Sequence, residues 1–246
     1  GGEEEVRLAL DLLSNCKRFV LEDCGLSSDV LVKLREDYRD RTKVVWRVYF
    51  GNGTSLTDAE VVRSVYDLKD SNCSELQYLE DVKYADFGHD EYLNDSSFLS
   101  GMKSLEVLII SGSPIKDLSP LSQCKNLRIL EIANCGYITD LSPLEDCESL
   151  EMLNISHTKA TEGLSALEER NITHLTAVGG IWNKISQEDR DAFQEDHPDC
   201  WIVTSGNEYG VGWRYEDKET KMEWYEKASE AFKYPHAPNN VGWYLE

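Results

Sequence analysis

Aliphatic residues recur along the chain in a short phrase whose first, fourth and sixth positions are apolar. Three close copies occupy residues 105–110, 127–132 and 150–155, and weaker copies occupy residues 82–87 and 172–177. The copies begin 22 or 23 residues apart. Apolar positions alternate with others inside each copy, which predicts a short strand with one face in the core. The fixed period predicts that these strands stack side by side.

A second phrase fills the interval between the strands. Residues 115–121 read IKDLSPL and residues 138–144 read ITDLSPL. Pro120 and Pro143 lack a backbone N–H donor, so this interval cannot be a long regular helix. It predicts a tight turn followed by a brief helical or 3-10 return to the next strand.

Together the two phrases resemble the leucine-rich repeats of bacterial internalin-type proteins, whose 22-residue unit carries the same I-x-D-L-x-P-L phrase. The resemblance is strong over residues 76–180. It implies an α/β leucine-rich-repeat solenoid, in which short helical or 3-10 returns back a curved parallel sheet. The Gly-Trp-Arg run at residues 212–214 is also similar to an extension of secreted leucine-rich-repeat proteins of gut Firmicutes.

The regions on either side of the repeats are interpreted as caps, because the end of a solenoid core must be covered. The expected organisation has four parts. Residues 1–75 form an N-terminal cap with irregular repeats, residues 76–180 the regular repeats, residues 181–204 a C-terminal cap, and residues 205–246 an aromatic-rich extension that packs on the solenoid.

Within the N-terminal cap, strand-like copies of the phrase stand at residues 16–21 and 45–50. Polar residues that favour helix starts precede residues 30 and 59, which predicts helices over residues 30–38 and 59–68.

In the C-terminal cap, Ser186 and Asp189 resemble a capping box that opens a helix through Phe193. A closing strand is expected at residues 200–204.

Nine of the last 42 residues are aromatic, and a helix is predicted over residues 217–233. Such an extension can pack back onto the solenoid flank. Alternatively, its rings can form a platform for a sugar or peptide, since Trp and Tyr combine flat apolar faces with a polar edge. Carbohydrate binding would use Trp213, Tyr215, Trp224 and Trp243.

The composition and charge of the chain limit the classes of partner that it can bind. The net charge of −21 repels phosphate backbones and anionic headgroups, so we expect neither nucleic acid nor membrane insertion. No apolar run reaches the length of a transmembrane helix.

The N-terminal residues carry no signal sequence, which fits a cytosolic protein or a secreted chain whose signal has been removed. The resemblance favours the second, an extracellular or cell-surface location.

Candidate chemistry is sparse. The sequence contains no G-x-S-x-G, P-loop or H-E-x-x-H motif and no C-x-x-C pair, so we predict no catalytic residue, metal site or cofactor. Cys124 and Cys147 hold inward-facing positions and Cys135 a turn position, which favours buried free thiols. A Cys124–Cys147 disulfide stays open as the alternative. His89 and His157 share one repeat position and are expected at the surface.

The phrase also assigns a face to each side chain. Positions 4 and 6 point into the core, whereas positions 3, 5 and 7 point onto the concave face of the sheet. Positions 3 and 5 supply the candidate ligand-binding residues, which are Arg47, Tyr49, Tyr84, Asp86, Val107, Ile109, Ile129, Glu131, Met152, Asn154 and His174. An apolar stripe open to water on so charged a chain indicates a binding face. The alternative is that the extension or a second molecule covers it.

These patterns predict a non-catalytic recognition module that binds a protein or peptide ligand on the concave face. Two alternatives remain. One is carbohydrate binding through the aromatic extension. The other is a cytosolic scaffold, similar to phosphatase-regulator repeats, in which all seven thiols are free.

Overall fold

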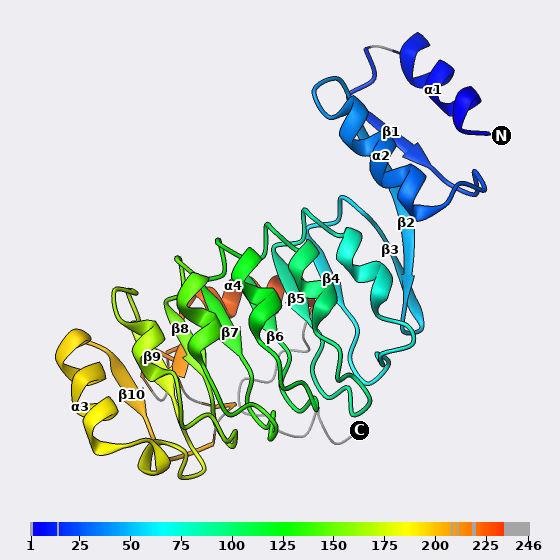
Figure 1. Cartoon of the computed structure of the whole chain (residues 1–246). Helices are drawn as coiled ribbons and strands as arrows, with labels where there is room; N and C mark the ends of the chain where they lie inside the picture. Colours follow the sequence, from blue (N-terminus) through cyan, green and yellow to red (C-terminus); the bar gives the residue numbers. More distant parts are fainter. Residues whose placement is uncertain (1, 14, 208, 211, 218–219, 234–246) are drawn as a thin grey trace.

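The computed structural model describes residues 2–13, 15–207, 209–210, 212–217 and 220–233. The chain is an elongated solenoid with a smaller N-terminal unit at one end (Figure 1). Its strands lie in two sheets, one of seven strands and one of three.

Short parallel strands form the seven-stranded sheet, in the order β10-β9-β8-β7-β6-β5-β4. They are β4 (Val61–Arg63), β5 (Tyr84–Asp86), β6 (Val107–Ile109), β7 (Ile129–Glu131), β8 (Met152–Asn154), β9 (His174–Thr176) and β10 (Trp201–Val203). Their register places Leu108 beside Leu130 and Leu130 beside Leu153. The strand positions and the parallel stacking predicted from the repeat are confirmed.

The intervals between strands are 3-10 helices, as the prolines predicted. They are η1 (Ser74–Tyr78), η2 (Ser97–Gly101), η3 (Ser119–Gln123), η4 (Ser142–Asp146), η5 (Leu164–Leu167) and η6 (Trp182–Lys184). Pro120 and Pro143 stand in the first turn of η3 and η4, where a missing N–H breaks no helical hydrogen bond. The main core lies between these helices and the sheet, and Leu108, Leu121 and Leu130 are fully buried there.

The turn after each of the strands β4 to β9 contains a residue with a left-handed backbone at the same repeat position, and Gly180 adds a second one after β9. The residues at this repeat position are Tyr66, His89, Gly112, Asn134, His157 and Gly179, with φ between 57° and 79°. The histidine rings lie over the next repeat: a Cβ on Gly112 would stand 2.9 Å from Nδ1 of His89, and one on Gly179 would stand closer still to Nδ1 of His157. Each histidine is therefore followed, one repeat later, by the residue that leaves room for its ring.

The N-terminal unit differs from the expected row of irregular repeats. It contains α1 (Glu3–Leu12), β1 (Arg18–Leu21), α2 (Ser28–Tyr38), β2 (Lys43–Phe50) and β3 (Gly53–Leu56). Strand β2 pairs in parallel with β1 and antiparallel with β3, in a sheet separate from the seven-stranded one. The helix predicted over residues 30–38 is confirmed by α2.

The helix predicted over residues 59–68 is wrong. Val61–Arg63 is instead β4, whose three residues pair in register with Tyr84–Asp86 of β5. Partners on a neighbouring strand outweigh the helical spacing of a short apolar run.

At the other end, α3 (Gln187–Asp196) begins where the capping box predicted, because the Ser186 hydroxyl accepts the Asp189 N–H at 3.0 Å. Strand β10 follows and pairs in parallel with β9. The extension then contributes η7 (Gly212–Arg214) and α4 (Glu223–Phe232). Figure 1 shows α4 on the side of the sheet opposite the 3-10 helices.

Candidate binding face

The concave face is the side of the seven-stranded sheet that turns away from the 3-10 helices. Val107, Ile109, Ile129 and Met152 lie on it and form a second apolar cluster, separate from the main core that contains Leu108, Leu130 and Leu153. The assignment of alternate residues to opposite faces is therefore confirmed.

The exposure expected for this face is wrong. Val107, Ile109, Ile129 and Met152 are all buried. They are covered by the C-terminal strap, the name used here for residues 212–217 and 220–233, which supplies Trp213, Tyr225, Ala228 and Phe232 to the same cluster. The strap packs on the concave sheet rather than on the flank, because that is where an apolar surface needs a partner.

Glu131 is the polar centre of this face. Its side chain is 0% exposed, and its carboxylate accepts hydrogen bonds from Nε1 of Trp213 at 2.8 Å and from Nη2 of Arg214 at 2.8 and 2.9 Å. The Ser111 hydroxyl adds a fourth contact at 3.2 Å. A carboxylate removed from water is tolerated only with a cation and hydrogen-bond donors around it. The strap supplies the cation and the indole donor.

Arg214 is held by rings as well as by charge. Its guanidinium lies 5.1 Å from the ring centre of Trp213, 5.4 Å from that of Tyr225 and 5.7 Å from that of Tyr209. Arginine favours such faces because its planar cation interacts with the ring quadrupole. The position is specific for a guanidinium flanked by aromatic side chains.

The helix of the strap covers the other half of the face. Tyr225, Ala228 and Phe232 lie on its inner side and are buried. Phe232 meets the ring of Tyr84 edge-on, with 6.3 Å between centroids. At the edge of the helix, Trp224 is 4.3 Å from the Arg128 guanidinium. Helix α4 contacts β4 and β5, whereas η7 contacts β8, β9 and β10.

The remaining polar candidates on the concave face bond locally. Asp86 accepts the Gly88 N–H at 3.1 Å and pairs with Arg63 at 3.4 Å, while Asn154 accepts the Ser156 N–H at 3.0 Å. The His174 ring lies 2.8 Å from the Thr173 hydroxyl, and burial lowers its pKa. These groups support the turns that follow the strands and the end of the sheet.

Arg47 and Tyr49 do not share the face with the other candidates, because β2 belongs to the three-stranded sheet. Arg47 pairs with Glu22 at 2.6 Å, and Tyr49 is 57% exposed. The pattern at residues 45–50 was that of a strand, but its partners could not be read from it.

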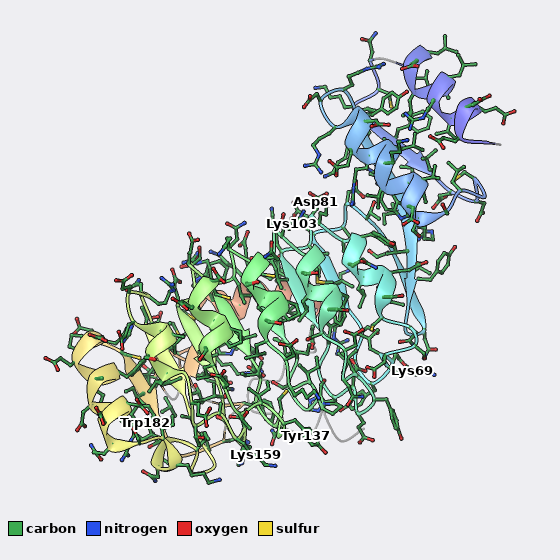
Figure 2. The ribbon with its side chains drawn as sticks, viewed as in Figure 1. Lys69, Asp81, Lys103, Tyr137, Lys159 and Trp182 are labelled. Carbon is green, nitrogen blue, oxygen red and sulfur yellow. The ribbon has the colours of Figure 1, made fainter. Side chains whose placement is uncertain are left out.

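The rims of the solenoid contrast with the covered centre. Tyr137 and Lys159 lie together at the rim where turns follow the strands, and Asp81 and Lys103 lie at the opposite rim (Figure 2). The Lys159 amine is 5.8 Å from the Tyr137 ring. Exposed charged and polar side chains thus lie at the rims, whereas the Glu131–Arg214 pair and the apolar cluster are buried between them.

Two of the four residues expected to bind a carbohydrate are not available to solvent. Trp213 and Tyr215 are buried in the strap, so neither presents a flat face to solvent. Trp224 is half-buried against Arg128, and Trp243 lies outside the described residues.

All seven cysteines are free, and the thiols of Cys124, Cys135 and Cys147 are buried. Burial raises the pKa of the Cys147 thiol to about 11, so these groups are unreactive hydrophobes. Cys135 also donates to the carbonyl of Ile110 at 3.3 Å, as expected for its turn position. Across the described residues, no three His, Cys, Asp or Glu side chains are grouped as a metal would require, and no helix there has the length and apolarity to span a bilayer.

Sequence reasoning selected Glu131 but missed its partners. It treated Trp213 as a candidate sugar ligand and left Arg214 without a role. One signal was available: a glutamate beside the apolar residues Ile109 and Ile129 needs a cation once that surface is covered.

Residues 103–146 match the family model described as Leucine Rich repeats (2 copies). A search of curated proteins finds no match. Among solved structures, an internalin (inlF) from Listeria monocytogenes is 18% identical over 61% of this chain and 49% of that chain, with a TM-score of 0.41.

A leucine-rich-repeat protein from Leptospira interrogans is 22% identical over 52% of this chain and 33% of that one, with a TM-score of 0.46. An internalin C2 from Listeria monocytogenes is 16% identical over 63% and 67%, with a TM-score of 0.35. The chain thus spans about half of the inlF structure and a third of the Leptospira structure.

Proposed function

We propose that this α/β leucine-rich-repeat solenoid is a non-catalytic recognition module that binds a protein or peptide partner on its concave face. One observation carries the proposal. The face already binds a peptide segment, its own strap, through the buried Glu131 and the apolar row beside it. Solenoids use extended concave surfaces of this kind for recognition.

The chemistry of the face favours a peptide over a small polar substrate. Its apolar residues contact side chains spread over more than one turn of a helix, and its central carboxylate holds a guanidinium and an indole together. Aromatic and arginine side chains are those that carry most binding energy in protein interfaces.

A partner on this face competes with the strap. The strap variant Tyr225→Ala/Phe232→Ala removes two anchors but leaves every residue of the face unchanged. We would use the native chain and this variant as baits in pull-downs from cell extracts and from the extracellular medium of the source organism. The retained proteins would then be analysed by cross-linking mass spectrometry. A partner of the face is enriched by the variant and cross-links near Lys83, which directly precedes β5, the strand that α4 contacts.

A third bait tests the location. Adding Ile109→Asp to the strap variant places a charge in the middle of the uncovered face, so a partner bound there should be lost. Glu226→Ala/Glu230→Ala alters two exposed residues of α4 and serves as the matched control. If all four baits retain the same proteins in equal amounts, binding takes place elsewhere on the chain.

We also propose an extracellular or cell-surface location, which rests on the resemblance of the repeats alone. The seven free thiols are what the cytosolic scaffold requires, so the two locations make opposite predictions for protein taken from its host. Thiol titration under denaturing, non-reducing conditions decides between them: seven free thiols favour the cytosol, and an intact disulfide favours the outside.

A further inference from the structure

We infer that the helix α4 is a displaceable stand-in for the partner, and that the partner presents an amphipathic helix with aromatic side chains at positions i and i+7 and a small residue at i+3. This inference rests on the proposed function and specifies its ligand. The pattern is that of Tyr225, Ala228 and Phe232, the three residues through which α4 sits on the sheet.

The two halves of the strap are held in different ways. The η7 half places Arg214 and Trp213 on Glu131, and all three side chains are almost wholly buried. Its release would break the buried ion pair and the indole hydrogen bond together, and would expose the Trp213 side chain to water. We therefore expect η7 to stay in place while α4 moves.

The α4 half carries no such penalty. Its inner side makes apolar contacts, and its rim makes a cation–π contact between Trp224 and Arg128 and an i,i+4 pair between Glu223 and Lys227 at 2.7 Å. Its outer residues Glu226 and Glu230 are exposed. When α4 leaves, the cation–π contacts of Trp224 with Arg128 and of Tyr225 with Arg214 are lost, but no ion pair is broken across the interface, because Glu131 keeps Arg214.

The length of α4 makes it easy to replace. It has 10 residues, and a helix of this length is marginal in water without a surface to fold on. Helix formation and docking are therefore one event. A longer helix of another protein, already folded, would dock on the same surface without that ordering cost.

The surface under α4 fits a helix. Half-buried Val61 and Tyr84 pack against the cluster that contains Phe232. Arg128 lies beside the first turn of α4, against the Trp224 ring. The hydrogen bond with Lys227 lowers the pKa of Glu223 in the same turn, and Arg128 adds to this shift. A helix laid into an apolar groove by anchors one and two turns apart is a recurring mode of peptide recognition.

The test uses the full chain and a fluorescein-labelled peptide of residues 221–233. We expect the peptide to bind the strap variant Tyr225→Ala/Phe232→Ala more than about tenfold more tightly than the native chain, because the α4 of the variant no longer competes for the apolar surface. Fluorescence anisotropy measures both affinities. The control variant Glu226→Ala/Glu230→Ala should bind like the native chain, and a peptide carrying Phe232→Ala should bind to neither.

Hydrogen exchange on the native chain gives a second, independent readout. Amides of α4 should exchange through an opening that leaves β7 protected. Exchange of α4 only together with the core strands would show that it does not open locally, and would overturn the inference.

Failure of the peptide to bind the folded strap variant would also overturn it. The proposed function can survive that result: a protein captured on the uncovered face, with no binding of the strap peptide, means that the face recognises a ligand of another shape. Peptide binding without any captured protein supports the groove and its ligand geometry, and counts against a protein partner in those extracts.

Discussion

Arg214 and Glu131 stand 83 positions apart in the sequence, and Nη2 of the arginine donates to both oxygens of the glutamate, at 2.8 and 2.9 Å. Neither side chain is accessible to solvent to more than a few per cent. This one contact connects the C-terminal strap to the middle of the repeat sheet.

Arg214→Ala should lower the free energy of unfolding by about 3–5 kcal/mol, because it leaves the Glu131 carboxylate buried without a cation. Urea unfolding followed by circular dichroism measures the loss. The double variant Glu131→Leu/Arg214→Leu should recover much of it, since no charge is then buried. A double variant as unstable as the single one would show that the loss comes from packing rather than charge.

Ile129→Asp should release the strap. From the sequence, position 129 faces solvent and tolerates a carboxylate; in the structure it is fully buried under the strap, where an unpaired charge is costly. We expect a red shift of tryptophan fluorescence at urea concentrations that leave the far-ultraviolet spectrum unchanged. Leu130→Ala, in the main core, should instead lower the stability of the whole solenoid by about 2–5 kcal/mol. Identical transitions for the two variants would contradict the separation of the two clusters.

Gly179→Ala should destabilise the chain by roughly 1–3 kcal/mol, because alanine is strained at φ 79° and its Cβ meets the His157 ring. In a His157→Ala background the steric part disappears and only the strain remains, about 1 kcal/mol. A thermodynamic cycle over the four proteins measures this coupling. Additive effects would mean that the ring does not lie over the glycine.

Asp90 should make stability fall as the pH rises. It is 1% exposed and accepts the Leu68 N–H at 2.8 Å, and burial raises its pKa from 3.8 to about 7. Its folded pKa lies above the unfolded one, so its contribution is complete below pH 4 and is lost as the pH rises through 7.

Asp90→Asn keeps an acceptor oxygen and removes the charge. The variant should be more stable than the native chain at pH 8, on the order of 1–3 kcal/mol, with the difference shrinking toward pH 4. Urea unfolding at several pH values measures it. A difference that does not change with pH would assign the effect to packing at Asp90 rather than to its ionisation.

The repeats could be predicted because their information is local. Leu108, Leu130 and Leu153 stand in equivalent places of successive repeats, and an error of one residue would have placed Ile129 and not Leu130 in the core. Pro120 and Pro143 likewise define the returns by their own chemistry. No other part of the chain is needed for these conclusions.

The strap could not be predicted in the same way. Trp213 and Arg214 contact Glu131 across more than 80 positions, and no period connects the two ends. The alternation of apolar residues showed which side chains point away from the core. It did not show whether these side chains are exposed to solvent or covered by another part of the chain. For β4, a three-residue strand is too short for its own pattern to outweigh a helical reading; only pairing with β5 defines it.

The left-handed turns make the repeats unequal as building blocks. A unit whose turn carries histidine, such as that of His89 or His157, fits only in front of a unit whose turn carries glycine. Deleting the unit that contains Gly112 would place Asn134 under the His89 ring, whereas deleting the units from Gly112 through His157 would join His89 to Gly179 and keep the match. Repeats can therefore be removed or inserted by engineering only where the new neighbours keep this match. The fit between adjacent turns, rather than the sequence of any single repeat, limits the order of the repeats.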